Sequence, residues 1–265
     1  RRIRGADPPR SVRVFVAVST ESFLPASGPA PTLAHLCERA EETGFDKLEL
    51  LLDETYGPLK PSEIAAAPDR FAATYRETTR LTPVGFCLAD DVSPEVTAGL
   101  ATAAKRLKIA QLTVPASPLG TPFNDEVDRL KAHHAAASPE AVRVSVRTRA
   151  GELTEDPDTA VQLCKAVKGL GITFDPSYFV SGPYAAVDRE NVFQHVFHVH
   201  LRDTSQDRLQ VKTGLGEIDY AKLIGRLQKE GYRGALAVDL LPEEIEKDER
   251  SLELRKLRML LETLL

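Results

Sequence analysis

The sequence predicts an α/β protein built as a single (β/α)8 barrel. Short apolar segments alternate with amphipathic segments eight times along the 265 residues, or about 33 residues for each repeat. This alternation is typical of a parallel sheet whose strands are joined by helices, and eight such units fill the ~250 residues usual for a closed barrel. A dinucleotide-binding or P-loop fold is disfavoured, because the chain has neither GxGxxG after the first expected strand nor GxxxxGK[ST].

Each expected strand is a short apolar segment, and in chain order these occupy residues 12–18, 47–52, 83–88, 109–114, 142–146, 172–174, 196–201 and 236–240. Each is followed by a segment that we expect to be helical, at residues 32–43, 69–80, 94–107, 124–137, 158–168, 188–193, 220–230 and 243–265. Gly44 and Gly169 end the first and fifth helices, because glycine readily adopts the left-handed conformation that follows a helix. Asn124 is the expected N-cap of the fourth helix.

The composition is that of a globular protein with its own core, at 42% hydrophobic and 28% charged residues. Lys+Arg 34 against Asp+Glu 39 gives a net charge of −5, which disfavours binding to nucleic acid or to an anionic membrane. No apolar segment approaches the ~18 residues of a membrane span. Three scattered cysteines without CxxC indicate reduced thiols in a cytoplasmic protein, although the first residue is Arg1 and a signal segment removed upstream stays open.

Two terminal segments have their own expectations. Residues 1–10 are rich in arginine and proline and are expected to form a flexible basic tail, so that residues 11–265 form the barrel domain. Near the other end, leucines recur at helical spacing, at Leu254, Leu257, Leu261 and Leu264. This stripe is too short for a coiled coil, so we expect it to dock the last helix on the barrel, with a homodimer contact as the alternative.

Functional side chains of such a barrel lie at the C-terminal ends of the strands and on the loops that follow. The polar residues at these positions are Glu49, Arg147, Asp175, His200, Asp203 and Asp239. Asp175, His200 and Asp239 combine carboxylate and imidazole groups, which are ligands for Mn²⁺, Zn²⁺, Co²⁺ or Mg²⁺. Asp175 is also typical of a turn with Pro176 and Ser177, and Glu49 could instead pair with a neighbouring basic residue.

The remaining histidines and glycines have simpler interpretations. Period two places His195, His198 and His200 on one face of the seventh strand, with only His200 near the functional end. The adjacent pair at positions 133 and 134 is expected to face solvent. The two glycines of the GLG segment at positions 214–216 fit either a phosphate-binding loop or a plain turn.

Several motifs occur in a fixed order along the chain, namely TGFDKLEL at 43–50, GITFDPSYFVSGP at 171–183, HVHLRDT at 198–204, GLGEIDY at 214–220, GYRG at 231–234 and AVDL at 237–240. In these segments the sequence resembles the xylose isomerase-like barrel superfamily, a group of sugar phosphate isomerases and epimerases related to AP endonuclease family 2. The resemblance covers nearly the whole chain and is densest from 171 to 240. It implies a barrel enzyme acting on a sugar or sugar phosphate.

The resemblance also implies a divalent metal held by a Glu on strand five, an Asp after strand six, a His on strand seven and a Glu on strand eight. Asp175 and His200 match two of these positions, and Asp239 stands where the strand-eight Glu is expected. Arg147 stands where the strand-five Glu is expected, and Tyr178 replaces the His usual in Asp-Pro-Ser-His. The metal set is therefore incomplete.

Arg147 changes the charge at its position by two units relative to Glu. A guanidinium is repelled by a divalent cation and cannot relieve this by losing its proton. We therefore expect Arg147 to replace the metal through bidentate hydrogen bonds to Asp175 and Asp239. The substrate is expected to contact Arg147, Tyr178, Arg202 and Asp203, with a surface ion pair as the alternative for Arg202 and Asp203.

Three functions follow from these observations. The first is a sugar or sugar-phosphate isomerase or epimerase that uses enediolate-type proton transfer, with Glu49, His200 and Asp239 as candidate catalytic residues. The second is a non-catalytic carbohydrate-binding barrel that has kept the pocket. The third, an AP-endonuclease-like DNA repair enzyme, is disfavoured because the six histidines are not placed to form a multi-zinc cluster. A Ser-His-Asp hydrolase would need a GxSxG motif, which the sequence lacks.

Overall fold

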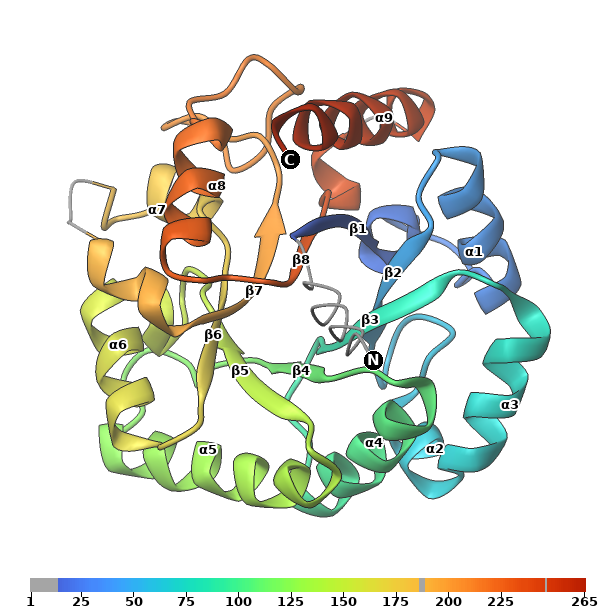
Figure 1. The fold of residues 1–265 in the computed structure, drawn as a ribbon, viewed down its shortest axis with the longest axis vertical. Helices are drawn as coiled ribbons and strands as arrows, with labels where there is room; N and C mark the ends of the chain where they lie inside the picture. Colours follow the sequence, from blue (N-terminus) through green and yellow to red (C-terminus); the bar gives the residue numbers. More distant parts are fainter. Residues whose placement is uncertain (1–13, 186–188, 246) are drawn as a thin grey trace, which may run out of the picture.

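The structure, a computed structural model, describes residues 14–185, 189–245 and 247–265. Within them, parallel strands close into a barrel in which each strand pairs with its neighbour along the chain and β8 pairs with β1 (Figure 1). The strands are β1 (Phe15–Ser19), β2 (Lys47–Leu52), β3 (Thr82–Leu88), β4 (Gln111–Val114), β5 (Arg143–Arg147), β6 (Gly171–Phe174), β7 (Val196–Leu201) and β8 (Ala235–Val238). The predicted fold class is confirmed.

Helices surround this barrel (Figure 1). The α-helices are α1 (Leu33–Glu42), α2 (Pro61–Ala66), α3 (Pro68–Thr78), α4 (Pro94–Leu107), α5 (Phe123–Ala137), α6 (Pro157–Ala166), α7 (Ser177–Val180), α8 (Tyr220–Lys229) and α9 (Lys247–Leu264). Single 3₁₀ turns are η1 (Thr20–Phe23), η2 (Ser138–Glu140), η3 (Leu153–Glu155), η4 (Glu190–His195) and η5 (Pro242–Glu244). Side chains cap four helix starts by accepting backbone N–H groups, at Thr32, Ser93, Asp156 and Asp219.

Most of the predicted elements are present, and β2, α4 and β7 have the predicted bounds. The prediction of Asn124 as an N-cap is wrong, because α5 begins at Phe123 after Pro122 and Asn124 lies inside its first turn. The helix expected at 188–193 is the 3₁₀ turn η4 instead. The predicted tail at 1–10 and the start of the first strand lie outside the described residues.

The last helix docks on the barrel as predicted. Leu254, Leu257 and Leu261 are fully buried, and Leu264 packs against the core at its edge. The barrel interior is more polar than the layer between strands and helices: Ser145 contacts both Gln111 and Thr173, and Thr113 hydrogen-bonds Thr173 at 2.8 Å.

His133 does not face solvent as expected. It is buried between α4 and α5, where its Nδ1 lies 2.8 Å from Thr97 Oγ1 and its Nε2 lies 3.0 Å from Asp91 Oδ1. Arg129 also pairs with Asp91, at 2.6 Å. These contacts tie α5 to α4 and to the loop before α4, so His133 has a structural role.

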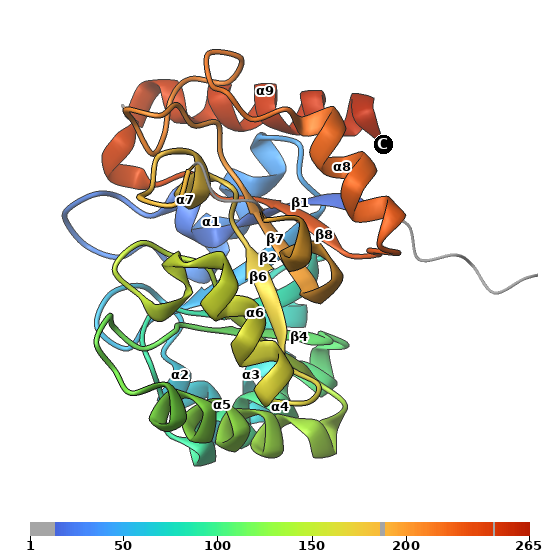
Figure 2. The same ribbon diagram turned by 90° about the vertical axis from the view of Figure 1, so that its left-hand side faces the viewer.

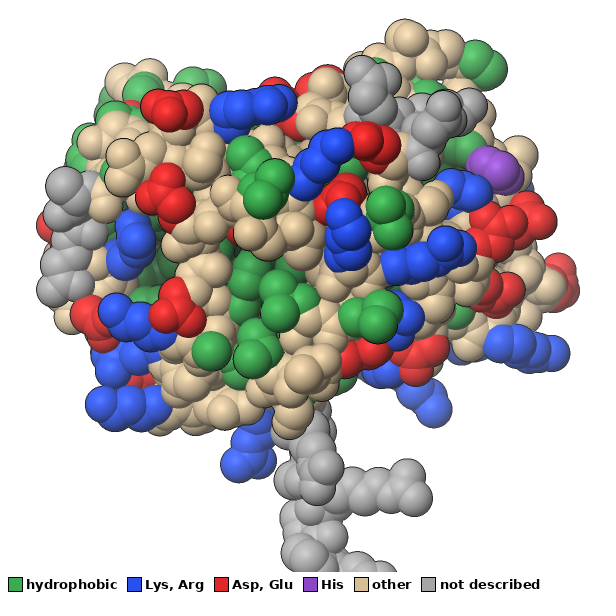
Figure 3. Space-filling model, turned by 90° about the horizontal axis from the view of Figure 1, so that it is seen from above, with side chains coloured by type: hydrophobic (Ala, Val, Ile, Leu, Met, Phe, Trp, Pro, Cys, Tyr) green, Lys and Arg blue, Asp and Glu red, His purple; other side chains and the backbone are tan. Residues whose placement is uncertain are grey.

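The connections that follow the strands gather at one end of the barrel, on the left of Figure 2. On the face of the molecule seen in Figure 3, acidic and basic side chains are interspersed around small apolar areas. No helix in the part of the chain that the structure describes is long and apolar enough to cross a membrane.

Candidate functional site

A cluster of buried charged side chains lies where several strands end. β2 supplies Glu49, and β7 supplies His198 and His200 on its inward face, with Arg202 just beyond the strand. The residues that directly follow β6 and β8 are Asp175 and Asp239, and both are only 3% exposed. The rule that functional side chains lie at the C-terminal ends of the strands (the strand-end rule) therefore correctly groups Glu49, Asp175, His200 and Asp239.

Arg202 connects the two aspartates. Its Nη1 donates to Asp175 Oδ2 at 2.7 Å and to Ser177 Oγ at 3.0 Å, and its Nη2 donates to Asp239 Oδ2 at 2.6 Å. Its Nε donates to the backbone carbonyl of Asp239 at 2.8 Å. Burial alone would lower the pKa of Arg202, but the two aspartates raise it above its ordinary value. Arg202 is a permanent cation in this position.

The prediction that Arg147 would neutralise the two aspartates is wrong. Arg147 does end β5 facing the barrel, but Glu152 on the following loop reaches back to it. Arg147 Nη2 donates to Glu152 Oε1 at 2.7 Å, and Nη1 donates to the Leu88 carbonyl at 3.3 Å. Burial opposes the charge of Arg147, while Glu152 raises its pKa. The Arg147 guanidinium is therefore paired with Glu152 and not with the two aspartates.

The loop after β6 fixes Asp175 and presents Tyr178. Asp175 Oδ1 accepts from the backbone N–H of Ser177 at 2.9 Å and from its hydroxyl group, so the turn and the charged site are the same feature. The Tyr178 ring lies 5.6 Å from the Arg202 guanidinium, in a cation–π arrangement. Burial raises the pKa of Tyr178, which keeps it a neutral hydroxyl group at the edge of the cluster.

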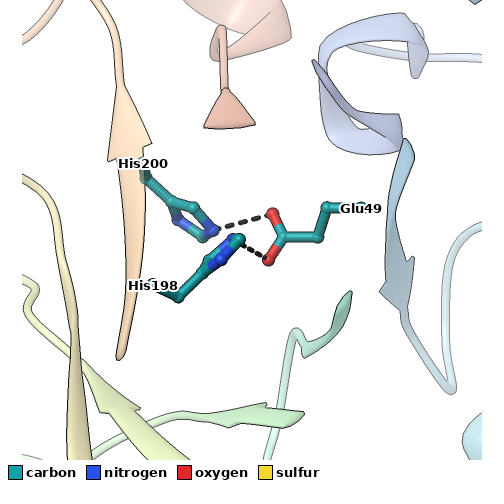
Figure 4. A group of neighbouring side chains, drawn as sticks. All are labelled: Glu49, His198 and His200. Atoms are coloured by element: carbon teal, nitrogen blue, oxygen red, sulfur yellow. Dashed lines mark ion pairs between the residues drawn. The ribbon is translucent and has the colours of Figure 1, made fainter. Parts of the chain in front are cut away.

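Glu49 faces His198 and His200 across the barrel interior (Figure 4). Glu49 Oε1 lies 2.8 Å from His198 Nε2, and Glu49 Oε2 lies 2.7 Å from His200 Nε2. His200 Nδ1 lies 3.6 Å from Asp239 Oδ2, so His200 connects Glu49 with the aspartates. His195, in contrast, belongs to η4 and not to β7, so the prediction that three histidines share a strand face is wrong.

The charges in this inner group affect one another strongly. Burial would raise the pKa of Glu49, but His200 and His198 lower it well below its ordinary range. Burial also disfavours the charged form of His200, but Glu49 and Asp239 raise its pKa to about 9. Glu49 is fully buried beneath the two imidazoles, so it acts on them and is not exposed to a substrate.

Glu21 is a member of the cluster that the sequence interpretation missed. It lies in η1, directly after β1, and is half-buried. Burial and the nearby Asp239 raise its pKa to about 7, although Arg202 partly opposes this shift. The strand-end rule could have found it, because β1 ends at Ser19.

The Asp203 carboxylate is held by backbone N–H groups of the loop that follows β7. Its Oδ2 accepts from the backbone N–H of Gly214 at 2.7 Å and of Gly216 at 3.2 Å, and its Oδ1 accepts from the N–H of Thr204 at 3.1 Å. A Cβ atom at position 216 would collide with this carboxylate. The GLG segment is therefore a turn closed on Asp203, which is one of the two alternatives that the sequence allowed.

Two groups of side chains bring three candidate ligand atoms within 4.8 Å of one another: Asp175 with His200 and Asp239, and Glu49 with His198 and His200. The first group corresponds to the metal position of the resembled superfamily. Both oxygens of Asp175 and Oδ2 of Asp239 already accept from protein donors, and the Arg202 guanidinium stands between them. A divalent cation does not fit there, because it would meet a fixed positive charge.

These features define a class of protein, a closed (β/α)8 barrel with a charged cluster at the C-terminal ends of its strands. Residues 37–259 match the model of the family described as xylose isomerase-like TIM barrel. The chain belongs to this family, which confirms the resemblance noted in the sequence.

Solved structures share this fold at low sequence identity. The chain is similar to a D-tagatose 3-epimerase-like protein (TM-score 0.70, 18% identity, 94% of this chain and 98% of that chain covered). It is also similar to the probable 3-DHS dehydratase AsbF of Bacillus anthracis (0.67, 15%, 94% and 98%) and to a D-allulose 3-epimerase of Methylomonas sp. (0.68, 12%, 96% and 98%). At identities this low, the structural similarity establishes the fold alone.

A sequence relative matches a shorter stretch. Over 95 residues, the chain is 28% identical to the uncharacterized protein MJ1311 of Methanocaldococcus jannaschii. The match covers 34% of this chain and 32% of that protein.

Proposed function

We propose that this protein is a sugar isomerase or epimerase that moves a proton next to the carbonyl group of its substrate. One observation carries the proposal: Asp239 Oδ1 is buried and has no hydrogen-bond partner among the described residues, while Oδ2 of the same carboxylate is held by Arg202. A carboxylate fixed in this way can take up a proton. The proposal is further supported by the fold neighbours named as a D-tagatose 3-epimerase-like protein and a D-allulose 3-epimerase.

The cluster offers the groups that such a reaction needs. Asp239 is the candidate base for the proton on the carbon next to the carbonyl. Arg202 supplies positive charge beside the position where an enediolate oxygen would become negative. Glu21, whose pKa is about 7, can hold or release a proton near neutral pH.

The other predicted residues have supporting roles in this proposal. His200 orients Asp239 from 3.6 Å, and Glu49 orients His200 from beneath. Tyr178 borders the cluster and is the candidate substrate contact among the predicted set. Arg147 reaches the same end of the barrel, but its pairing with Glu152 limits it to a contact at the rim.

The proposal is tested by proton exchange. The protein is incubated in D₂O with D-allulose, D-tagatose and D-fructose, and deuterium incorporation next to the carbonyl is followed by NMR. Asp239→Asn is expected to lower exchange by about 10²–10⁴-fold, the usual contribution of a general base. Asp207→Asn, on an exposed loop position, is the matched control and is expected to exchange like the wild type.

A second candidate function has its own observation. Because a protein guanidinium occupies the position of the family's metal, the barrel could bind a carbohydrate without converting it. This alternative predicts saturable binding of a ketohexose by calorimetry together with no deuterium exchange in the folded wild-type protein. Exchange above the buffer rate would exclude it.

A further inference from the structure

We infer that a groove beside the charged cluster binds a small carboxylic acid with an apolar body, and that Arg250 holds the carboxylate group of this ligand. The groove lies between the connections that follow β7, β8 and β1, and the described residues that line it do not include Glu21, Arg202 or Asp239. The inference is therefore independent of the proposed sugar chemistry.

The groove has the size and the walls of a small-molecule site. It encloses about 1110 Å³, which is enough for a ligand of drug size. All three connections contribute apolar wall residues, including Phe23, Pro25, Pro31, Val211, Leu215 and Ile245. Leu215 is 73% exposed, so a ligand in the groove would cover apolar surface that faces solvent in the free protein.

Hydrogen bonds join the walls of the groove. Arg250 Nη1 donates to the Leu24 carbonyl after β1 at 2.6 Å, and its Nη2 donates to the Pro242 carbonyl after β8 at 3.0 Å. Gln210, after β7, accepts from the backbone N–H of Leu241 at 2.7 Å. Because these bonds fix the walls relative to one another, the groove is formed before a ligand binds, and the cost of ordering it on binding is small.

Arg250 brings a positive charge into this groove. The residue is only 8% exposed and forms no ion pair with any residue that the structure describes. Its Nη atoms donate to backbone carbonyls, and its Nε is buried without a hydrogen-bond partner in the described ranges. Buried charges in proteins are usually paired, so an anion placed in the groove would be stabilised by this guanidinium.

The two arginines of the charged cluster show the contrast. Both Arg202 and Arg147 pair with carboxylates, which raise their pKa values despite burial. Burial instead lowers the pKa of Arg250, the nearby Arg39 lowers it further, and Glu243 opposes this shift only in part. The protein thus provides no carboxylate for Arg250 comparable to those of the cluster.

The charges at the rim of the groove are already matched. Lys212 Nζ lies 2.7 Å from Glu249 Oε1, and Arg208 Nη2 lies 4.0 Å from Glu244 Oε2. Arg250 therefore carries the positive charge that a ligand would meet within the walls.

The ligand class follows from the walls, the guanidinium and the rim. A guanidinium matches the planar geometry of a carboxylate, and the apolar walls fit a hydrocarbon or aromatic body. Glu243, Glu244 and Glu249 also line the groove, so an anion with several charges would be repelled at the rim. A singly charged, apolar carboxylic acid is the expected ligand.

The wild-type protein gives the first test, with a matched pair of fluorescent probes. Anilinonaphthalene sulfonate (ANS) carries one negative charge, and phenylnaphthylamine (NPN) has the same rings without it. ANS is expected to bind at one saturable site per chain, at least about tenfold more tightly than NPN, and octanoate is expected to displace it better than octanol. Equal affinity for the two probes, or no saturable binding of ANS, would overturn the inference.

Arg250→Met gives the second test, because it removes the charge and keeps much of the side-chain length. It is expected to weaken ANS binding by roughly 10–100-fold, the loss of a hydrogen bond to a charged group, and to leave NPN binding unchanged. Unchanged NPN binding shows that the groove is intact, so the variant separates a lost charge from a collapsed wall. Unchanged ANS affinity would contradict the role of Arg250.

A surface variant locates the site even if Arg250→Met does not fold. Leu215→Ser changes an exposed wall residue and is expected to weaken both probes by roughly 4–15-fold, the effect of one or two buried CH₂ groups. Met259→Ser, at a 59% exposed position of α9 outside the groove, is the matched control and is expected to bind both probes like the wild type. Equal probe affinities in the two serine variants would show that the probes bind elsewhere and would overturn the inference.

Discussion

Arg202→Met is the most informative single substitution, because it removes the cation that joins the two aspartates. The methionine side chain occupies similar space but carries no charge. Four hydrogen bonds disappear, and Asp175 Oδ2 and Asp239 Oδ2 lose donors that stand at 2.7 and 2.6 Å in the wild type. Both carboxylates stay buried, at 3% exposure.

The size of the effect follows from that burial. Removing one partner of a buried ion pair costs roughly 3–5 kcal/mol, because the other charge is left without compensation. For a domain of this size each kcal/mol lowers the Tm by about 2–4 °C. We therefore expect the Tm of Arg202→Met to fall by roughly 6–20 °C.

The assay is thermal and urea unfolding of the wild type and three variants. Arg202→Lys keeps the charge but loses the forked geometry, so its stability is expected to lie between those of the wild type and Arg202→Met. The triple variant R202M/D175N/D239N removes both buried negative charges and is expected to recover most of the lost stability. A Tm of Arg202→Met close to that of the wild type would refute the reasoning, and so would a triple variant no more stable than the single one.

Three further predictions concern the surroundings of the cluster. The pKa of Glu21 in the folded protein is about 7, against an ordinary value of 4.5. Its contribution to the free energy of unfolding is therefore complete below pH 4.5 and is lost as the pH rises through 7. Glu21→Gln should remove this pH dependence, up to about 3 kcal/mol, measured as the difference in urea stability between pH 5 and pH 8. Arg147→Glu places two carboxylates together and should destabilise the protein, whereas the exchanged pair R147E/E152R should regain stability; equal Tm values for both would contradict the pairing. Gly216→Ala should cost about 1–3 kcal/mol by driving its Cβ against Asp203, and an unchanged Tm would show that this turn is not tightly packed.

The fold was predictable because the barrel repeats one local pattern. Apolar strands such as β2 and β7 are marked by composition alone, and α4 is bounded by Ser93 and Pro94 at its start, so their ends agree with the prediction. The helices α2 and α7 were not expected, because six and four residues are too few to show a helical period. Local sequence also could not show that Pro122, and not Asn124, precedes α5.

The site was predictable in its membership but not in its pairings. The strand-end rule names the residues that share one end of the barrel, but it does not say which side chains reach one another. Arg147 and Arg202 are both candidates to pair with the two aspartates. Glu152, five residues beyond Arg147, binds the Arg147 guanidinium, so Arg202 holds the aspartates. Period two along β7 places Arg202 on the side of His200, and this was the signal that could have identified the correct arginine.

The turn closed on Asp203 bears on whether the proposed sugar substrate is neutral or phosphorylated. The backbone amides of Gly214 and Gly216 are the kind of donors that hold a phosphate in other proteins, but here they already bind a carboxylate of the same chain. A phosphorylated sugar would have to displace that carboxylate and leave it uncompensated beside its own negative charge. If the protein acts on a sugar as proposed, this loop is therefore expected to favour a neutral sugar over its phosphate ester, because the Asp203 carboxylate competes for the same amides.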